Sequence, residues 1–245
     1  MSLEIGIITL FADAFAALSH GVIGRAIENN LIKIKFYNPR DFSTNQHGNV
    51  DDKPYGGGAG MVMQVQPLRA AINAARAEIG TDTMVIYLSP QGAPVTQNLL
   101  QKYNDQFKKF IFICGRYDGV DQRIIEHDID QEWCVGDFIV SGGELPTMMV
   151  LDALGRLQEG VLGHNDSNKF DSFSNGLLEH PHYTRPEEID GQKVPNVLLS
   201  GNHKEINEFR AKQALINTWH KRPELLKSAT LDRMQREWLK DLTED

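Results

Sequence analysis

Short apolar runs alternate with segments of helical periodicity along the first two thirds of the chain. Residues 5–11 are almost continuously apolar, which is typical of a strand that is covered on both faces. Residues 32–36 alternate Ile or Phe with Lys, and this period of two predicts a half-exposed edge strand. Further apolar runs, which predict buried strands, lie at residues 84–88, 110–114 and 133–140. This order of strands and helices predicts an α/β fold with a largely parallel sheet.

The pattern becomes helical after Pro146. Residues 147–157 place apolar side chains at helical spacing, and a proline in the first turn suits the start of a helix. This helix is expected to end near Gly160. Residues 163–176 are dense in Asn, Asp, Ser and Gly, a composition typical of a flexible linker between domains.

Two further helices are predicted near the C-terminus. Asn202, followed three residues later by Glu205, is a capping-box pattern, and the helix that it begins should break at Pro223. A last helix is expected over residues 231–242. The predicted organisation is therefore a domain at residues 1–160, a linker at 161–176 and a small, mainly helical domain at 177–245.

Three of the predicted strands lead into loops that contain glycine. The loops are LSPQG at residues 88–92, CGRYDG at 114–119 and SGGELP at 141–146. One such turn alone would carry little weight, because glycine is common between strands and helices. Ligands of open α/β sheets bind beyond the carboxyl ends of the strands, where glycine lets the backbone approach the ligand. Three such loops together predict a ligand pocket.

The composition indicates a globular protein rather than a membrane protein. No apolar run approaches the roughly 20 residues that a bilayer span needs, and the N-terminus lacks the basic region of a signal peptide. We therefore expect a cytoplasmic protein with no membrane partner. Cys114 and Cys134 lack CxxC spacing, so they are expected to be small buried side chains rather than zinc ligands or a disulfide.

Two short motifs suggest nucleotide or metal sites but lack the required residues. The glycine-rich stretch at 53–61 has no Gly-Lys-Ser/Thr ending of a P-loop, and Met61 replaces the last glycine of a dinucleotide-binding motif. His180 and His182 have no third ligand at a recognisable spacing. We therefore assign no metal ligand from the sequence.

An ordered set of motifs covers nearly the whole chain. The set closely resembles the bacterial tRNA (guanine-N1)-methyltransferase family, TrmD, and it comprises GRAIENNLIKI, PRDFS, VDDKPYGGGAGM, VIYLSPQG, CGRYDGVDQR, VGDFIVSGGELP, GVLGH, DSFSNGLLEHPHYTRP and VPNVLLSGNH. The resemblance implies a parallel-sheet SPOUT domain with a deep trefoil knot, a small, mainly helical C-terminal domain, and a homodimer. Hydrophobic periodicity does not itself predict a knot, because knotted chains are rare.

The resemblance also implies that S-adenosylmethionine is the methyl donor, bound in a bent form by the knot loops. Backbone amides and carbonyls suit the adenine edge and the ribose. The residues assigned to the donor pocket are Tyr87, Leu88, Ser89, Pro90, Gln91, Gly115, Arg116, Tyr117, Asp118, Cys134, Val135, Gly136, Asp137, Phe138, Ile139, Val140, Gly142 and Gly143.

Three positions depart from the family pattern. Asp118, Phe138 and Glu179 stand where Glu, Tyr and Asp are expected. The position of Asp118 makes it a candidate for the amino-acid end of the donor or for a divalent ion, although its side chain is shorter than glutamate. Mg²⁺ is a candidate cofactor by resemblance, and no cluster of ligands in the sequence identifies a site for it.

The chemistry of guanine sets two requirements for a catalytic site. Neutral guanine carries a proton on N1, so a base must remove that proton before N1 can attack a methyl group. Negative charge then spreads over N1 and O6, and a cation near O6 stabilises it. By resemblance, Asp171 in DSFSNG is the base, and Arg156 stabilises O6 and helps to position Asp171.

The substrate implied by the resemblance is the guanosine at position 37 of tRNA, just 3′ to the anticodon, whose methylation supports reading-frame maintenance. The linker and C-terminal domain are expected to recognise the anticodon stem-loop, because proteins read unstacked bases of RNA loops. A net charge of −8 means that phosphate contacts require local basic patches. The candidates are Arg210, Lys212, Lys221, Arg222, Arg233 and Arg236.

Two alternative functions remain open at this point. One is a SPOUT methyltransferase that modifies another RNA or a ribose hydroxyl, and the block from Asp171 to Pro186 argues against it. The other is a catalytically silent RNA-binding dimer, which the presence of both Arg156 and Asp171 disfavours. The sequence does not determine which tRNAs are preferred or how tightly the donor binds.

Overall fold

The computed structural model describes residues 2–163 and 171–244, and it divides the chain into two compact units, Met1–Asn165 and Asp166–Asp245. Residues 164–170 of the predicted linker lie outside the described part. The elements of the first unit are β1 (Leu3–Ile8), η1 (Ala12–Ser19), α1 (Gly21–Glu28), β2 (Ile32–Tyr37), η2 (Pro39–Phe42), β3 (Asp51–Asp52), β4 (Val62–Met63), α2 (Val65–Ile79), β5 (Met84–Pro94), α3 (Gln97–Gln106), β6 (Lys109–Ile113), α4 (Gln122–Asp128), β7 (Gln131–Cys134) and α5 (Glu144–Arg156).

A five-stranded parallel sheet forms the centre of the first unit, with the strand order β2-β1-β6-β5-β7. The prediction of an α/β fold with a parallel sheet is confirmed. The predicted edge position of residues 32–36 is also confirmed, because β2 pairs with β1 alone. A parallel sheet needs apolar side chains on both faces, since helices cover both.

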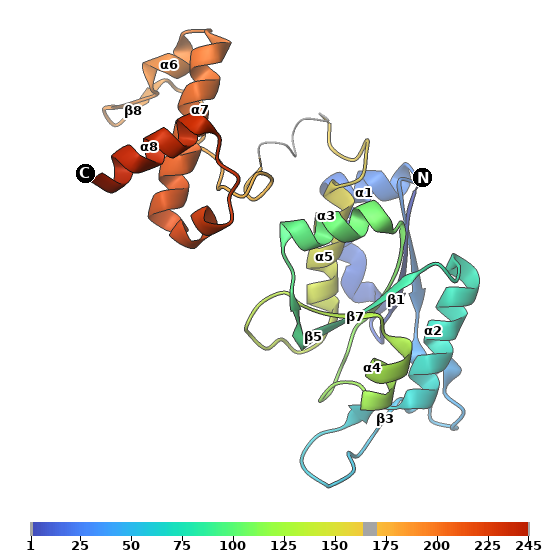
Figure 1. Ribbon diagram of the computed structural model, residues 1–245. Helices are drawn as coiled ribbons and strands as arrows, with labels where there is room; N and C mark the ends of the chain where they lie inside the picture. The colour runs from blue at the N-terminus through green and yellow to red at the C-terminus, as the bar shows by residue number, and fades with distance from the viewer. Residues whose placement is uncertain (1, 164–170, 245) are drawn as a thin grey trace. The chain divides into compact units, whose positions relative to one another are not determined.

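Successive residues of the central strands supply two separate cores. Phe110 and Phe112 of β6 face one core, and Ile111 and Ile113 face the other. The first core is completed by α1, α3 and α5, and the second by α2 and α4. Figure 1 shows these two groups of helices on opposite sides of the sheet. The unit is therefore a three-layered structure in which the sheet is buried on both sides.

Two of the predicted strands differ in length from the observed ones. The third apolar run forms a strand only as far as Cys134, because the backbone bends over residues 135–138. Strand β5 extends to Pro94, beyond the predicted end at residue 88, although its pairing with β7 is interrupted. Leu88 and Ala93 both pair with Trp133, so the residues between them leave the sheet and the chain then returns to it.

The glycine-rich stretch at 53–61 joins the short antiparallel strands β3 and β4. Its C-terminal end is bonded to the loop after β6, because Asp118 N donates to Met61 O over 2.9 Å. Met63 N likewise donates to Gly119 O over 3.0 Å. These two bonds hold the hairpin beside one of the three predicted ligand loops.

The second unit is mainly helical around a small apolar core of Leu177, Leu215 and Leu231. Among residues 2–163 and 171–244, no helix is long and apolar enough to cross a membrane. The elements of this unit are β8 (Glu188–Ile189), β9 (Gln192–Lys193), α6 (Asn196–Leu199), α7 (His203–Lys221), η4 (Pro223–Lys227) and α8 (Arg233–Glu244).

Helix α7 starts and stops as predicted, but its cap differs from a capping box. The Asn202 side chain accepts a hydrogen bond from Lys204 N over 3.2 Å, which confirms the cap. In a complete capping box, the Glu205 carboxylate would also accept a bond from Asn202 N, and this second bond is not formed. The Asn202 amide instead donates to Ser200 Oγ over 3.1 Å, so Ser200 satisfies the group that Glu205 was expected to satisfy.

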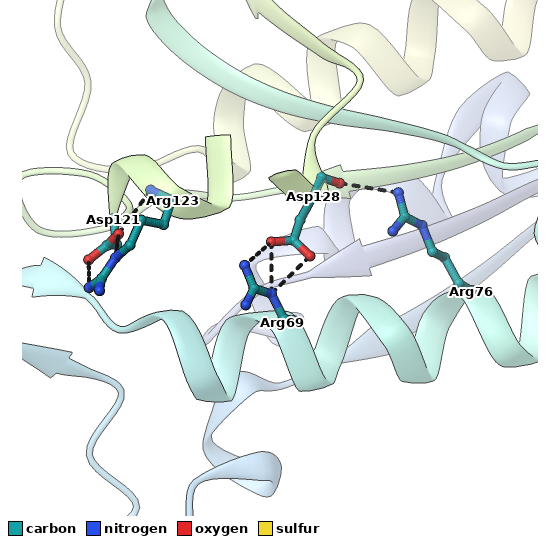
Figure 2. Close-up of polar contacts among 5 residues, drawn as sticks. All are labelled: Arg69, Arg76, Asp121, Arg123 and Asp128. Carbon is teal, nitrogen blue, oxygen red and sulfur yellow. Dashed lines mark hydrogen bonds and ion pairs between the residues drawn. The ribbon is translucent and has the colours of Figure 1, made fainter. Parts of the chain in front are cut away.

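An ion-pair cluster joins α2 to α4 (Figure 2). The Arg69 guanidinium binds both carboxylate oxygens of Asp128, with Nη2 2.8 Å from Oδ2. Arg76 donates to the backbone carbonyl of the same residue over 3.2 Å. At the other end of α4, Arg123 holds the pKa of Asp121 at about 2, and Asp121 caps the helix. The Asp128 carboxylate is buried, so its pairing with Arg69 is needed to offset its loss of hydration.

Replacement of Asp128 by alanine should destabilise the first unit. The change leaves Arg69 without its bidentate partner, and we expect the free energy of unfolding to fall by about 1–3 kcal/mol. Urea unfolding followed by circular dichroism measures the loss. The matched control is Asp152→Ala, which removes an exposed carboxylate from α5 and should change stability by less than about 0.5 kcal/mol. Equal stability of the two variants would contradict this role for the Arg69–Asp128 pair.

Candidate functional site

A cavity of about 340 Å³ lies beyond the carboxyl ends of β5, β6 and β7. This volume is in the range of small-molecule sites. All three glycine-containing loops contribute to it, as predicted. The lining residues are Tyr87, Leu88, Ser89, Pro90, Gly115, Tyr117, Asp118, Gly119, Trp133, Cys134, Val135, Gly136, Phe138, Ile139, Val140, Ser141, Gly142, Gly143 and Pro146.

The cavity brings together most of the residues assigned to the donor pocket. Gln91, Arg116 and Asp137 are the predicted residues that do not line it. Four lining residues were missed, namely Gly119, Trp133, Ser141 and Pro146. Gly119, Trp133 and Ser141 directly adjoin predicted segments, and Pro146 lies three residues beyond Gly143, so slightly longer segments would have included all four.

Close contact between two backbone segments forms one wall of the cavity. Gly143 N donates to Gly115 O over 2.9 Å. A Cβ atom on Gly143 would lie 2.7 Å from Cys114 Cα and 2.9 Å from Gly115 N, closer than real Cβ atoms come to such atoms. Glycine is therefore required at position 143 because the start of α5 packs directly on the loop after β6.

Asp118 is the single charged residue among those that line the cavity. Its carboxylate lies against Gly60 of the glycine-rich hairpin, where a Cβ atom would overlap the carboxylate oxygens. Gly60 also has a φ of +99°, a conformation that other residues rarely adopt. The hairpin is thus adjacent to the cavity. The sequence of residues 53–61 matches no complete nucleotide-binding motif and did not predict this position.

Two ionisable groups at or behind the cavity wall, the Tyr87 hydroxyl and the Cys114 thiol, have raised pKa values. Burial raises the pKa of the Tyr87 hydroxyl, and Glu132 raises it further. Burial also raises the pKa of the Cys114 thiol, whose sulfur lies 3.2 Å from Thr147 Oγ1. Both cysteines are free and buried, as the sequence predicts. The cavity therefore combines a largely apolar lining with one carboxylate, that of Asp118.

The two predicted catalytic residues lie in different compact units. Arg156 is the last residue of α5 and is half-buried. Asp171 belongs to a turn of the second unit, in which its carbonyl accepts hydrogen bonds from the amide and hydroxyl of Ser174. Asp171 also lines a second cavity, of about 570 Å³, together with Leu178, Asn207 and other residues of the second unit.

Several of the predicted basic residues of the second unit are engaged within it. Arg222 pairs with Glu224, and Arg233 with Glu237. Arg236 donates to a backbone carbonyl, and Lys212 Nζ lies 5.9 Å from the centre of the Trp238 ring. To bind a polyanion, these side chains must therefore exchange their present contacts for contacts with phosphate groups.

The two histidines of the His-Pro-His motif do not form a metal site with a third ligand. Their rings lie 4.6 Å apart, and His182 Nε2 is 3.2 Å from Glu179 Oε2. Within residues 2–163 and 171–244, no group of three or more His, Cys, Asp or Glu side chains is placed to hold a metal ion. Asp118 is likewise a single carboxylate at its cavity, so the described residues identify no dedicated metal site there.

Comparison with known proteins identifies relatives over the full length of the chain. The profile of the family described as tRNA (Guanine-1)-methyltransferase TrmD matches residues 3–228. Proteins named tRNA (guanine-N(1)-)-methyltransferase from Pasteurella multocida and Coxiella burnetii are 52% and 49% identical, covering 97% and 100% of this chain and 97% and 99% of their own lengths. A protein of the same name from Photorhabdus laumondii is 53% identical over 95% of this chain and 93% of its own length. The chain belongs to the tRNA (guanine-1)-methyltransferase family.

Proposed function

We propose that this protein transfers the methyl group of S-adenosylmethionine to N1 of the guanosine at position 37 of tRNA. The observation that carries the proposal is membership of a family whose full-length relatives are named for methylation of guanine N1 in tRNA. The same membership favours guanine N1 over a ribose hydroxyl or another RNA as the site of modification. Since tRNA is the substrate, the enzyme acts in the cytoplasm.

The cavity of the first unit is the proposed donor site. Its apolar lining suits the adenine ring, and the backbone groups of its glycine-containing loops can bond to the nucleoside edges. Asp118 supplies the negative charge that a cationic donor requires. The loops are proposed to form the trefoil knot of the SPOUT family. When bound, the donor supplies a methyl group that is electrophilic because it is attached to a positively charged sulfur.

Asp171 is the proposed general base, and Arg156 the proposed stabiliser of the guanine. The Asp171 carboxylate takes the proton from N1, which frees the electron pair that forms the new bond to the methyl group. The Arg156 guanidinium then compensates the negative charge that develops on O6. The bond between sulfur and methyl breaks as the bond to N1 forms, which leaves S-adenosylhomocysteine and a neutral methylated base.

A homodimer is proposed because the first unit exposes an apolar surface beside the donor cavity. Ile139 is 81% exposed, and Phe138, Leu145 and Met149 are each more than half exposed. Exposed apolar side chains in one region mark interaction surfaces, and a second copy of this chain is the partner that the family implies. The second unit, which carries Asp171, is proposed to hold the anticodon stem-loop.

Asp171→Asn should greatly slow methyl transfer without changing the affinity for the donor. Asparagine keeps the size of aspartate but cannot accept the N1 proton, so the single-turnover rate on an unmodified tRNA transcript should fall by roughly 10²–10⁴-fold. The control is Asp190→Asn, an exposed aspartate in the turn between β8 and β9, which should retain the wild-type rate. A wild-type rate for Asp171→Asn would rule out Asp171 as the base.

Mixed dimers test whether one site uses residues of two chains. An Arg156→Ala subunit paired with an Asp171→Ala subunit regains one intact site if the donor cavity and the base come from different chains. An equal mixture, refolded or exchanged to equilibrium, should then recover about a quarter of the wild-type activity. Activity no higher than that of either parent would show that each site is built from a single chain.

A further inference from the structure

Glu144 is a buried carboxylate at the first position of α5, next to the wall of the donor cavity. It is 3% exposed. Thr9 Oγ1 donates to its Oε1 over 2.9 Å, and Arg116 Nε donates to the same atom over 3.1 Å. Arg116 Nη2 lies 2.9 Å from Oε2. A buried carboxylate is stable only when its charge is compensated, so Glu144 fixes the position of the Arg116 guanidinium.

The Arg116 guanidinium in turn joins three loops at the carboxyl edge of the sheet. Its Nη1 donates to Ser141 O over 3.2 Å, and the guanidinium packs so closely on Gly142 that a Cβ atom there would lie 2.4 Å from Nε. Its central carbon lies 4.5 Å from the centre of the Phe11 ring. The loops that carry these partners follow β1, β6 and β7. One side chain therefore connects the ends of three strands.

These contacts act on the cavity although Arg116 does not line it. The residues on either side of Arg116, Gly115 and Tyr117, are both lining residues, and so are Ser141 and Gly142. The distance between the two loops, and with it the width of the cavity, thus depends on the pair. The Arg69–Asp128 pair is of the same chemical kind, but neither of its members borders a lining residue. Variants of the Arg69–Asp128 pair are therefore a control that changes the stability of the first unit but not the cavity.

We propose that Arg116 and Glu144 are positioning residues that set the width of the donor cavity and so determine donor affinity without touching the donor. The inference rests on the proposed function, because it takes the ligand of this cavity to be the methyl donor. Arginine is required at position 116 since its planar guanidinium makes the contacts to Glu144, Ser141 and Phe11 together. Lysine keeps the charge but presents a single nitrogen, which cannot reach these partners in the same geometry.

The test is calorimetric titration of the full-length protein with S-adenosylhomocysteine, the demethylated form of the donor. Arg116→Lys and Glu144→Gln should each weaken binding by about tenfold or more, and the double variant should lose less than the product of the two effects. The control Arg69→Lys should lower the melting temperature while its affinity stays within about twofold of the wild type. Wild-type affinity in both Arg116→Lys and Glu144→Gln would overturn the inference.

If Arg116→Lys and Glu144→Gln do not fold, the Thr9→Val variant provides the same test of donor affinity. Valine matches the shape of threonine but removes the hydroxyl that donates to Glu144 and accepts from Phe11 N, so it loosens the same network while keeping every charge. A folded Thr9→Val protein should bind S-adenosylhomocysteine several-fold more weakly, and unchanged affinity would contradict the inference. Failure of the wild-type protein itself to bind this ligand would overturn the proposed function, and the inference with it.

Discussion

At the carboxyl edge of the sheet, the backbone of Gly143 packs directly on that of Cys114 and Gly115, and no side chain fits between them. The arrangement brings the start of α5 onto the loop after β6, at a cavity that both segments line. Such a surface can bind a nucleoside through its edges without a charged side chain for every contact. The pair of the half-buried Arg116 with the buried Glu144 connects the same two loops.

The proposed reaction divides its requirements between the two compact units. The first unit contains the cavity and Arg156, and the second contains Asp171. A donor site that is complete within one unit can fill before RNA arrives, whereas proton removal depends on a residue carried by the unit proposed to hold the RNA. In the proposed reaction, methyl transfer therefore requires both units, the one with the donor cavity and the one with the base.

The sequence predicted the central sheet well, because strands buried on both faces form continuous apolar runs such as residues 110–114. It also placed the loops of the cavity, since glycine and proline mark the points where strands end. It did not reveal the Glu144 network, whose bonds join residues 28 and 135 positions apart. Nor did it predict the return of the chain from Leu88 to Ala93, which depends on pairing with a distant strand. Local pattern specifies local structure, but contacts across the sheet require the fold.

Mass spectrometric mapping of the product decides whether this protein methylates N1 of guanine at one position of tRNA. The protein is incubated with S-adenosylmethionine and an unmodified tRNA transcript, and the RNA is then digested to fragments and nucleosides. We expect N1-methylguanosine in the fragment containing position 37, and none when that guanosine is replaced by adenosine. Methylation of a ribose, of another base or of another position would contradict it, as would the absence of any methylated product.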